Sequence, residues 1–80
     1  MKINLIQGSY QPAEAINLIA KLIEEKIKFQ EDRISRSCNE EDIKMRESRI
    51  KELQNELAAV RKGILDKGTR VEMRSIIEIN

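Results

Sequence analysis

A single apolar seam along residues 43–64 is the feature that most constrains how this chain can fold. After a first step of seven residues, its members recur at alternating steps of three and four, and charged or amide side chains fill most of the positions between them. This spacing is typical of one face of an α-helix. Such a helix gains most of its stability by packing that face against another element. The seam consists of Ile43, Ile50, Leu53, Leu57, Val60 and Ile64.

Residues 12–35 are predicted to form the partner helix, and they show two apolar stripes instead of one. Pro12 suits a first helical position, where its missing N–H has no acceptor to lose, and Glu14 complements the positive end of the helix dipole. A helix turns by about 100° per residue, which places the apolar residues on two separate stripes. The first stripe, which Gln30 interrupts, and the second stripe are, respectively, Ile16, Ile19, Ala20, Ile23, Ile27 and Ile34, and Ala15, Leu18, Leu22 and Phe29. The first helix must therefore pack against two separate elements, one for each stripe.

The connection at residues 36–39 is short enough to make the two helices antiparallel neighbours. Two caps are open for the second helix, predicted at about 40–67: a capping box of Ser37 with Glu40, or Asn39 ahead of an acidic first turn. Lys67 and Gly68 are typical of a helix end, since glycine tolerates the left-handed cap. The sequence thus predicts an antiparallel helical hairpin with a coiled-coil seam.

Both termini read as short strands, at about residues 2–7 and 69–79. The first has an aliphatic core that we expect to end at a turn over residues 8–11, and the second alternates apolar and polar residues. The strands enter and leave the hairpin at one end, so they can pair antiparallel and cover the second stripe. We predict one α+β, mostly helical domain over residues 1–80, ordered β-α-α-β and completed by oligomerisation.

Self-association is expected because the chain offers few other stabilisers. Among its 80 residues only one is cysteine and aromatics make up 2%, so neither a disulfide nor a large mixed core is available. A two-stranded sheet is marginal alone, and its edges invite another strand. The expected partner is a second copy, as a homodimer or a larger assembly, with another protein as an alternative. The expected contact residues are Leu18, Leu22, Phe29, Val71 and Met73.

The residue types argue against catalysis. Histidine is absent, which removes the usual general base and the commonest zinc ligand. Cys38 has neither a resolving thiol nor a base, and the acidic run at residues 40–42 fits a helix first turn better than a calcium loop. Gly8-Ser9 has the outline of an anion cradle but reads as a plain turn. We predict no enzyme, no cofactor and no metal.

Charge leaves one alternative function. The net charge is +1, so no long-range field attracts a polyanion. If Arg70 and Arg74 share the exposed face of the last strand, a dimeric β-ribbon that reads nucleic acid is conceivable, although Glu72 and Glu78 would share that face. No segment is apolar enough for a membrane, and a cytoplasmic location is expected. The leading hypothesis is a non-enzymatic interaction or scaffold protein; the alternative is a small dimeric repressor or antitoxin-like regulator.

Overall fold

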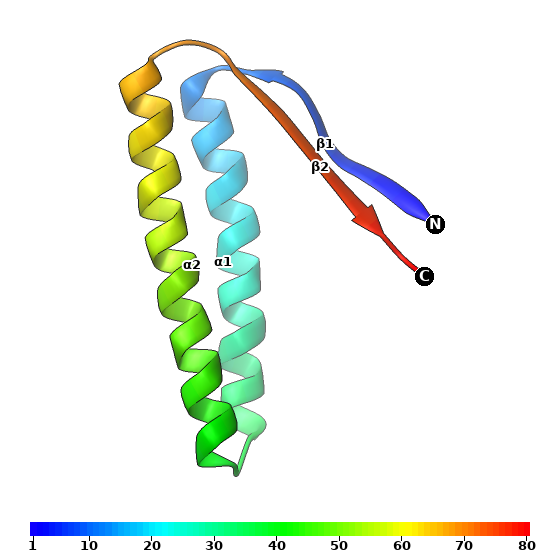
Figure 1. Ribbon diagram of the computed structural model, residues 1–80, viewed down its shortest axis with the longest axis vertical. Helices are drawn as coiled ribbons and strands as arrows, with labels where there is room; N and C mark the ends of the chain where they lie inside the picture. The colour runs from blue at the N-terminus through cyan, green and yellow to red at the C-terminus, as the bar shows by residue number, and fades with distance from the viewer.

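The computed structural model describes residues 1–80 as four elements in the order β1 (Lys2–Tyr10), α1 (Pro12–Arg36), α2 (Glu40–Lys67) and β2 (Val71–Glu78). The two helices form an antiparallel hairpin, and the two strands pair with each other at its open end (Figure 1). This confirms the predicted β-α-α-β layout. It also shows that the strands pair antiparallel within one chain.

The core of the hairpin is a thin seam between the helices. Leu53 of α2 is 1% exposed and is the only large side chain that the fold buries completely. Ile64 near the end of α2 and Ala15 near the start of α1 are buried too, while the first stripe of α1 is half-buried throughout. The other members of the predicted seam are less enclosed: Ile43, Ile50 and Leu57 are half-buried, and Val60 is 36% exposed.

Each helix begins and ends at a specific cap. Gln11 precedes α1, and its backbone N–H donates to Glu14 Oε1 at 3.2 Å. Asn39 caps α2: its Oδ1 accepts from the backbone N–H groups of Glu41 at 2.9 Å and Asp42 at 3.2 Å. Of the two caps left open by the sequence, Asn39 is therefore the one used. At the other end of α2, Gly68 adopts φ 65°, the left-handed conformation that side-chain-bearing residues avoid.

The first strand is longer than the sequence indicates. Gly8, Ser9 and Tyr10 pair with Met73, Glu72 and Val71, so β1 runs on to Tyr10. The prediction of a turn over residues 8–11 was wrong, because cross-strand pairing overrides the local preference of glycine and serine. Gly8 has φ 152°, which suits glycine alone. Gly8 and Ser9 therefore lie within a strand and do not form the turn on which an anion cradle would depend.

The register of the strands contains one irregularity. Lys2, Ile3 and Asn4 lie opposite Glu78, Ile77 and Ile76, and the pairing then shifts by one residue so that Ile6 lies opposite Ser75. The extra residue in β1 is Leu5. Such a bulge bends and twists the strand that contains it.

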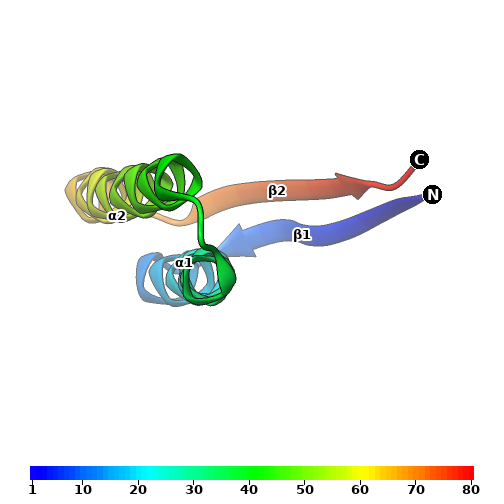
Figure 2. The same cartoon turned by 90° about the horizontal axis from the view of Figure 1, so that it is seen from below.

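The strands form a ribbon that projects to one side of the helices (Figure 2). Residues directly opposite each other share a face, so the register defines an inner face whose members near the hairpin are buried or half-buried: Ile6, Gly8, Tyr10, Val71, Met73 and Ser75. The intervening residues of both strands are exposed. Contact between β2 and the helices is mainly with α1. The ribbon thus covers the start of the second stripe and then diverges from it.

The resulting molecule is extended. Its radius of gyration is 15.1 Å, whereas a compact domain of this length has a radius of about 12 Å. Its principal extents are 46 × 33 × 13 Å, so it is a thin V with the hairpin and the ribbon as its arms (Figure 1). Only four residues are buried. A V of this kind leaves the inner surfaces of both arms open to solvent.

Candidate functional site

The residues predicted to mediate self-association lie on the two arms of the V. Leu18 and Leu22 on α1, with Val71 and Met73 on β2, are half-buried near the base where the arms meet. Phe29 lies farther along α1 and is 53% exposed. Four of the five predicted residues are therefore half-buried, and Phe29 is exposed.

Phe29 contacts one polar neighbour. The guanidinium carbon of Arg33 lies 5.0 Å from the centroid of the Phe29 ring, which is the geometry of a cation–π contact. Such a contact at an exposed site contributes about 0.5–1 kcal/mol, too little to substitute for burial of the ring. Phe29 is thus an exposed aromatic side chain on α1, in the hairpin arm of the V.

The outer half of the ribbon is a second apolar surface. None of its residues is among the five that the sequence predicts for self-association. Its exposed fractions run from 41% to 46%, in contrast to the half-buried residues at the ribbon base. One signal was present: Ile76 and Ile77 are consecutive, so alternation alone places one aliphatic side chain on each face of the strand. The members of this surface are Ile3, Leu5, Ile76, Ile77 and Ile79.

The chain has more accessible surface than a compact chain of its mass. The chain exposes 6291 Å², whereas a compact monomer of this mass exposes about 5,000 Å². The excess, roughly 1,300 Å², is larger than the area of about 800 Å² that one partner contributes to a protein interface of standard size. The extended shape therefore leaves more additional surface than one partner contributes to a specific interface.

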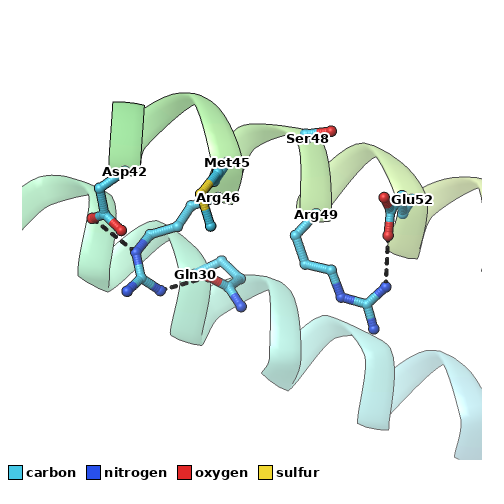
Figure 3. Close-up of a pocket in the computed structure, with 7 residues that line it drawn as sticks. All are labelled: Gln30, Asp42, Met45, Arg46, Ser48, Arg49 and Glu52. Carbon is cyan, nitrogen blue, oxygen red and sulfur yellow. Dashed lines mark hydrogen bonds and ion pairs between the residues drawn. The ribbon is translucent and has the colours of Figure 1, made fainter. Parts of the chain in front are cut away.

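A polar groove runs along the flank of the hairpin and explains the break in the first stripe (Figure 3). Gln30 of α1 accepts a hydrogen bond from Arg46 Nη1 of α2 at 2.9 Å, and Arg46 Nε donates to Asp42 Oδ2 at 3.1 Å. Farther along, Arg49 pairs with Glu52 at 2.9 Å and Glu56 at 3.5 Å. The polar residue that interrupts the stripe, Gln30, therefore has a hydrogen-bond partner on the other helix.

The groove has no free positive charge for a ligand. The Arg46 guanidinium and, to a smaller degree, the Ser37 hydroxyl hold the pKa of Asp42 below its usual value, because both hydrogen-bond its carboxylate. Since Arg46 and Arg49 are each bound to carboxylates, an added anion would have to displace those partners. We interpret the groove as a structural link between the helices.

The two arginines considered for nucleic acid have different surroundings. Arg70 Nε donates to Ser9 Oγ and Arg70 Nη2 donates to the Ser9 carbonyl oxygen, both at 2.9 Å. Arg70 thus fastens the end of β1 to the start of β2. Arg74 is exposed and lies on the same face as Glu72 and Glu78. The two arginines do not form a joint basic surface.

Other reactive residue types are dispersed. Cys38 is a free, exposed thiol in the turn between the helices, at the far end from the ribbon. Tyr10 is half-buried at the end of β1, where its ring lies 3.8 Å from the position that a Gly8 side chain would occupy. No group of three or more acidic or cysteine side chains is placed to hold a metal ion.

Neither helix is long and apolar enough to cross a membrane. Comparison with protein-family models, with curated proteins and with solved structures finds no significant match to the chain. The surfaces described above are thus the basis for assigning a role.

Proposed function

We propose that the chain is a small non-enzymatic interaction protein that works as a homo-oligomer, with the lining of the V as its association surface. The hairpin is the rigid part, and the second stripe of α1 with the ribbon forms the part that a second copy covers. No side chain in the chain is paired with a base in the way that a nucleophile requires. The proposal therefore assigns binding and scaffolding, without turnover.

The observation that supports self-association is the excess of accessible surface, together with exposed large apolar side chains, on a chain that buries only four residues. A monomer with so small a core has little to offset the conformational entropy of 80 ordered residues. Covering the lining with a second copy removes apolar surface from water at about 25 cal/mol per Å². Association thus supplies the burial that the single chain lacks.

Size-exclusion chromatography with light scattering tests this proposal. Across a hundredfold concentration range, the molar mass should be twice that of the chain or a higher multiple, and it should fall on dilution. The Phe29→Ser variant should shift the equilibrium toward the monomer, because it removes an exposed apolar ring. Lys51→Ser, an exposed position on α2, is the matched control and should leave the mass unchanged. A monomeric mass at every concentration would contradict the proposal.

The nucleic-acid alternative has weaker support. Arg70 is engaged by Ser9 within the chain, and Arg74 shares its face with two carboxylates. Binding through phosphate contacts would weaken steeply with salt. Fluorescence anisotropy of labelled duplex DNA at low salt is the test; we expect no change on adding the protein. A salt-dependent rise in anisotropy that Arg74→Ala abolishes would favour this alternative.

A further inference from the structure

The outer edge of β2 is self-complementary, and we propose that a second copy pairs there antiparallel, with Ile76 opposite Ile76 of the second copy. The two ribbons would form one four-stranded sheet with the strand order β1-β2-β2-β1. This inference rests on the self-association proposed above and adds a contact along the edge of β2 to the one proposed for the lining of the V. Four observations support it: the direction of the backbone groups, the location of the bulge, the pattern of charge and the exposure of the ribbon tip.

The hydrogen bonds at the end of the ribbon show which backbone groups of β2 are free. Met1 and Ile79 exchange both of their backbone bonds, at 2.8 Å and 2.7 Å, so they form a hydrogen-bonded pair. Such pairs alternate with non-hydrogen-bonded pairs along an antiparallel ladder. The N–H and C=O groups of Ile76 and Glu78 therefore point away from β1. The same alternation continues along β2 to Arg74 and Glu72.

Only one of the two ribbon edges is suited to accept another strand. β1 contains the bulge at Leu5, and bulges at an edge twist it away from further pairing. β2 runs from Val71 to Glu78 with no insertion of its own, and no other element lies along its outer side (Figure 2). The edge of β2 therefore offers a regular, unpaired ladder.

The charges on β2 select the register. Pairing the free groups of two β2 strands places even-numbered residues opposite even-numbered residues, so the oppositions among Glu72, Arg74, Ile76 and Glu78 distinguish the registers. Centring on Arg74 would oppose two arginines, and centring on Ser75 would oppose Glu72 to Glu78. Centring on Ile76 instead opposes Arg74 to Glu78 on both sides of the axis. Like charges in direct opposition are unfavourable and opposite charges favourable.

A register centred on Met73 also opposes unlike charges, Glu72 to Arg74, but it uses only the base of the strand. It would leave Ile77 and Ile79 without a partner and run the second copy past the turn at Gly68. The register centred on Ile76 uses the exposed tip instead. Of the four registers compared, it is thus the one that opposes unlike charges and also pairs the apolar residues of the tip.

The same register joins the apolar faces. Because opposed residues share a face, Ile77 meets Ser75 of the second copy and Ile79 meets Met73 of the second copy on the inner side. On the outer side, Glu78 lies between Lys2 of its own chain, which it already contacts at 3.7 Å, and Arg74 of the second copy. Ile76, now 46% exposed, gains an aliphatic neighbour across the axis.

Cysteine cross-linking tests the register directly. In a Cys38→Ser background, Ile76→Cys should give a covalent dimer under mild oxidation, because opposed Cα atoms of a hydrogen-bonded pair lie about 5.5 Å apart, within the range that a disulfide bridges. Glu72→Cys in the same background is the control. Its two copies would lie about 26 Å apart along the strands, so it should remain monomeric on a denaturing gel.

A charge exchange provides an independent measurement. Arg74→Glu should weaken dimerisation about tenfold, because two favourable pairs become two repulsive ones. Adding Glu78→Arg to that variant restores unlike charges across the axis and should recover the dimer. Sedimentation velocity gives the dissociation constants, and circular dichroism checks that each variant keeps the hairpin.

The outcomes separate this inference from the proposed function. A chain that is monomeric at all concentrations overturns both. A dimer in which the Ile76 and Glu72 cysteine variants cross-link equally, or in which the charge exchange has no effect, overturns the β2 register and leaves self-association standing through another surface.

Discussion

At the scale of single residues, the side chains that depart from the apolar pattern have structural partners. Gln30 breaks the first stripe of α1, and it accepts a hydrogen bond from Arg46 across the hairpin. Arg70 immediately precedes β2, and it donates hydrogen bonds to Ser9 near the end of β1. Polar links of this kind fix which residues face each other, and apolar packing alone specifies this less strictly.

Asp42 gives the hairpin a dependence on pH. Its pKa is lower in the folded chain than its usual value of 3.8, so the unfolded state takes up the proton first as pH falls. The contribution of Asp42 to stability is therefore present above that usual value and is lost as pH falls through the folded pKa. Thermal unfolding followed by circular dichroism from about pH 7 to about pH 2 should show this loss.

Two variants isolate that effect. Asp42→Asn removes the titrating group, so its melting temperature should fall less between neutral and acid pH than that of the unchanged chain. Arg46→Ala removes the main cause of the lowered pKa and should flatten the curve in the same pH region. Asp66→Asn changes a carboxylate on the last turn of α2 that forms no ion pair, and it serves as the control. Identical acid profiles for all four proteins would show that the Asp42–Arg46 pair does not contribute.

At the scale of the elements, the sequence predicts the helices better than the strands. Pro12, Asn39 and Gly68 mark helix boundaries through local chemistry, and the structure uses all three. The end of β1 depends on pairing with residues more than sixty positions away, so local propensity mispredicts it at Gly8. The bulge at Leu5 and the divergence of the ribbon from α1 are likewise set by tertiary geometry. The five predicted association residues accordingly omit the ribbon tip.

The two glycines of α2 and its cap give a matched pair of variants. Gly68→Ala forces a side chain into φ 65° and should destabilise the fold by about 1–2 kcal/mol. Gly63→Ala lies within the helix, and nothing stands within 4 Å of the added methyl group. It should stabilise the fold by about 0.5–1 kcal/mol. Urea unfolding measures both; a loss of stability at Gly63 or none at Gly68 would contradict the assigned helix end.

Leucine and phenylalanine variants distinguish the two stripes. Leu53→Ser creates a cavity and buries a hydroxyl at the one fully enclosed large side chain, so it should cost about 3–5 kcal/mol and dismantle the hairpin. Leu57→Ser should act in the same direction. Leu22→Ser and Phe29→Ser should reduce association while circular dichroism still reports helix. If all four variants lost helix alike, the assignment of separate stripes would be wrong.

At the scale of the whole molecule, the V shape leaves the burial of apolar surface incomplete. The hairpin buries the seam between its helices, and the strands of the ribbon hydrogen-bond to each other along one edge each. Neither arm covers the inner surface of the other beyond the base. A protein that needs a second copy to bury that lining has its stability coupled to its concentration. A monomer that buries its apolar surface within one chain has a stability that does not depend on concentration.

The dependence of the melting temperature on protein concentration is therefore the most direct test. The account predicts that the midpoint rises by several degrees as the protein is concentrated a hundredfold, because mass action favours the associated, folded state. Reversibility on cooling must be shown at each concentration. A midpoint that stays constant across that range, with full helical signal at the lowest concentration, would contradict the claim that association completes the fold.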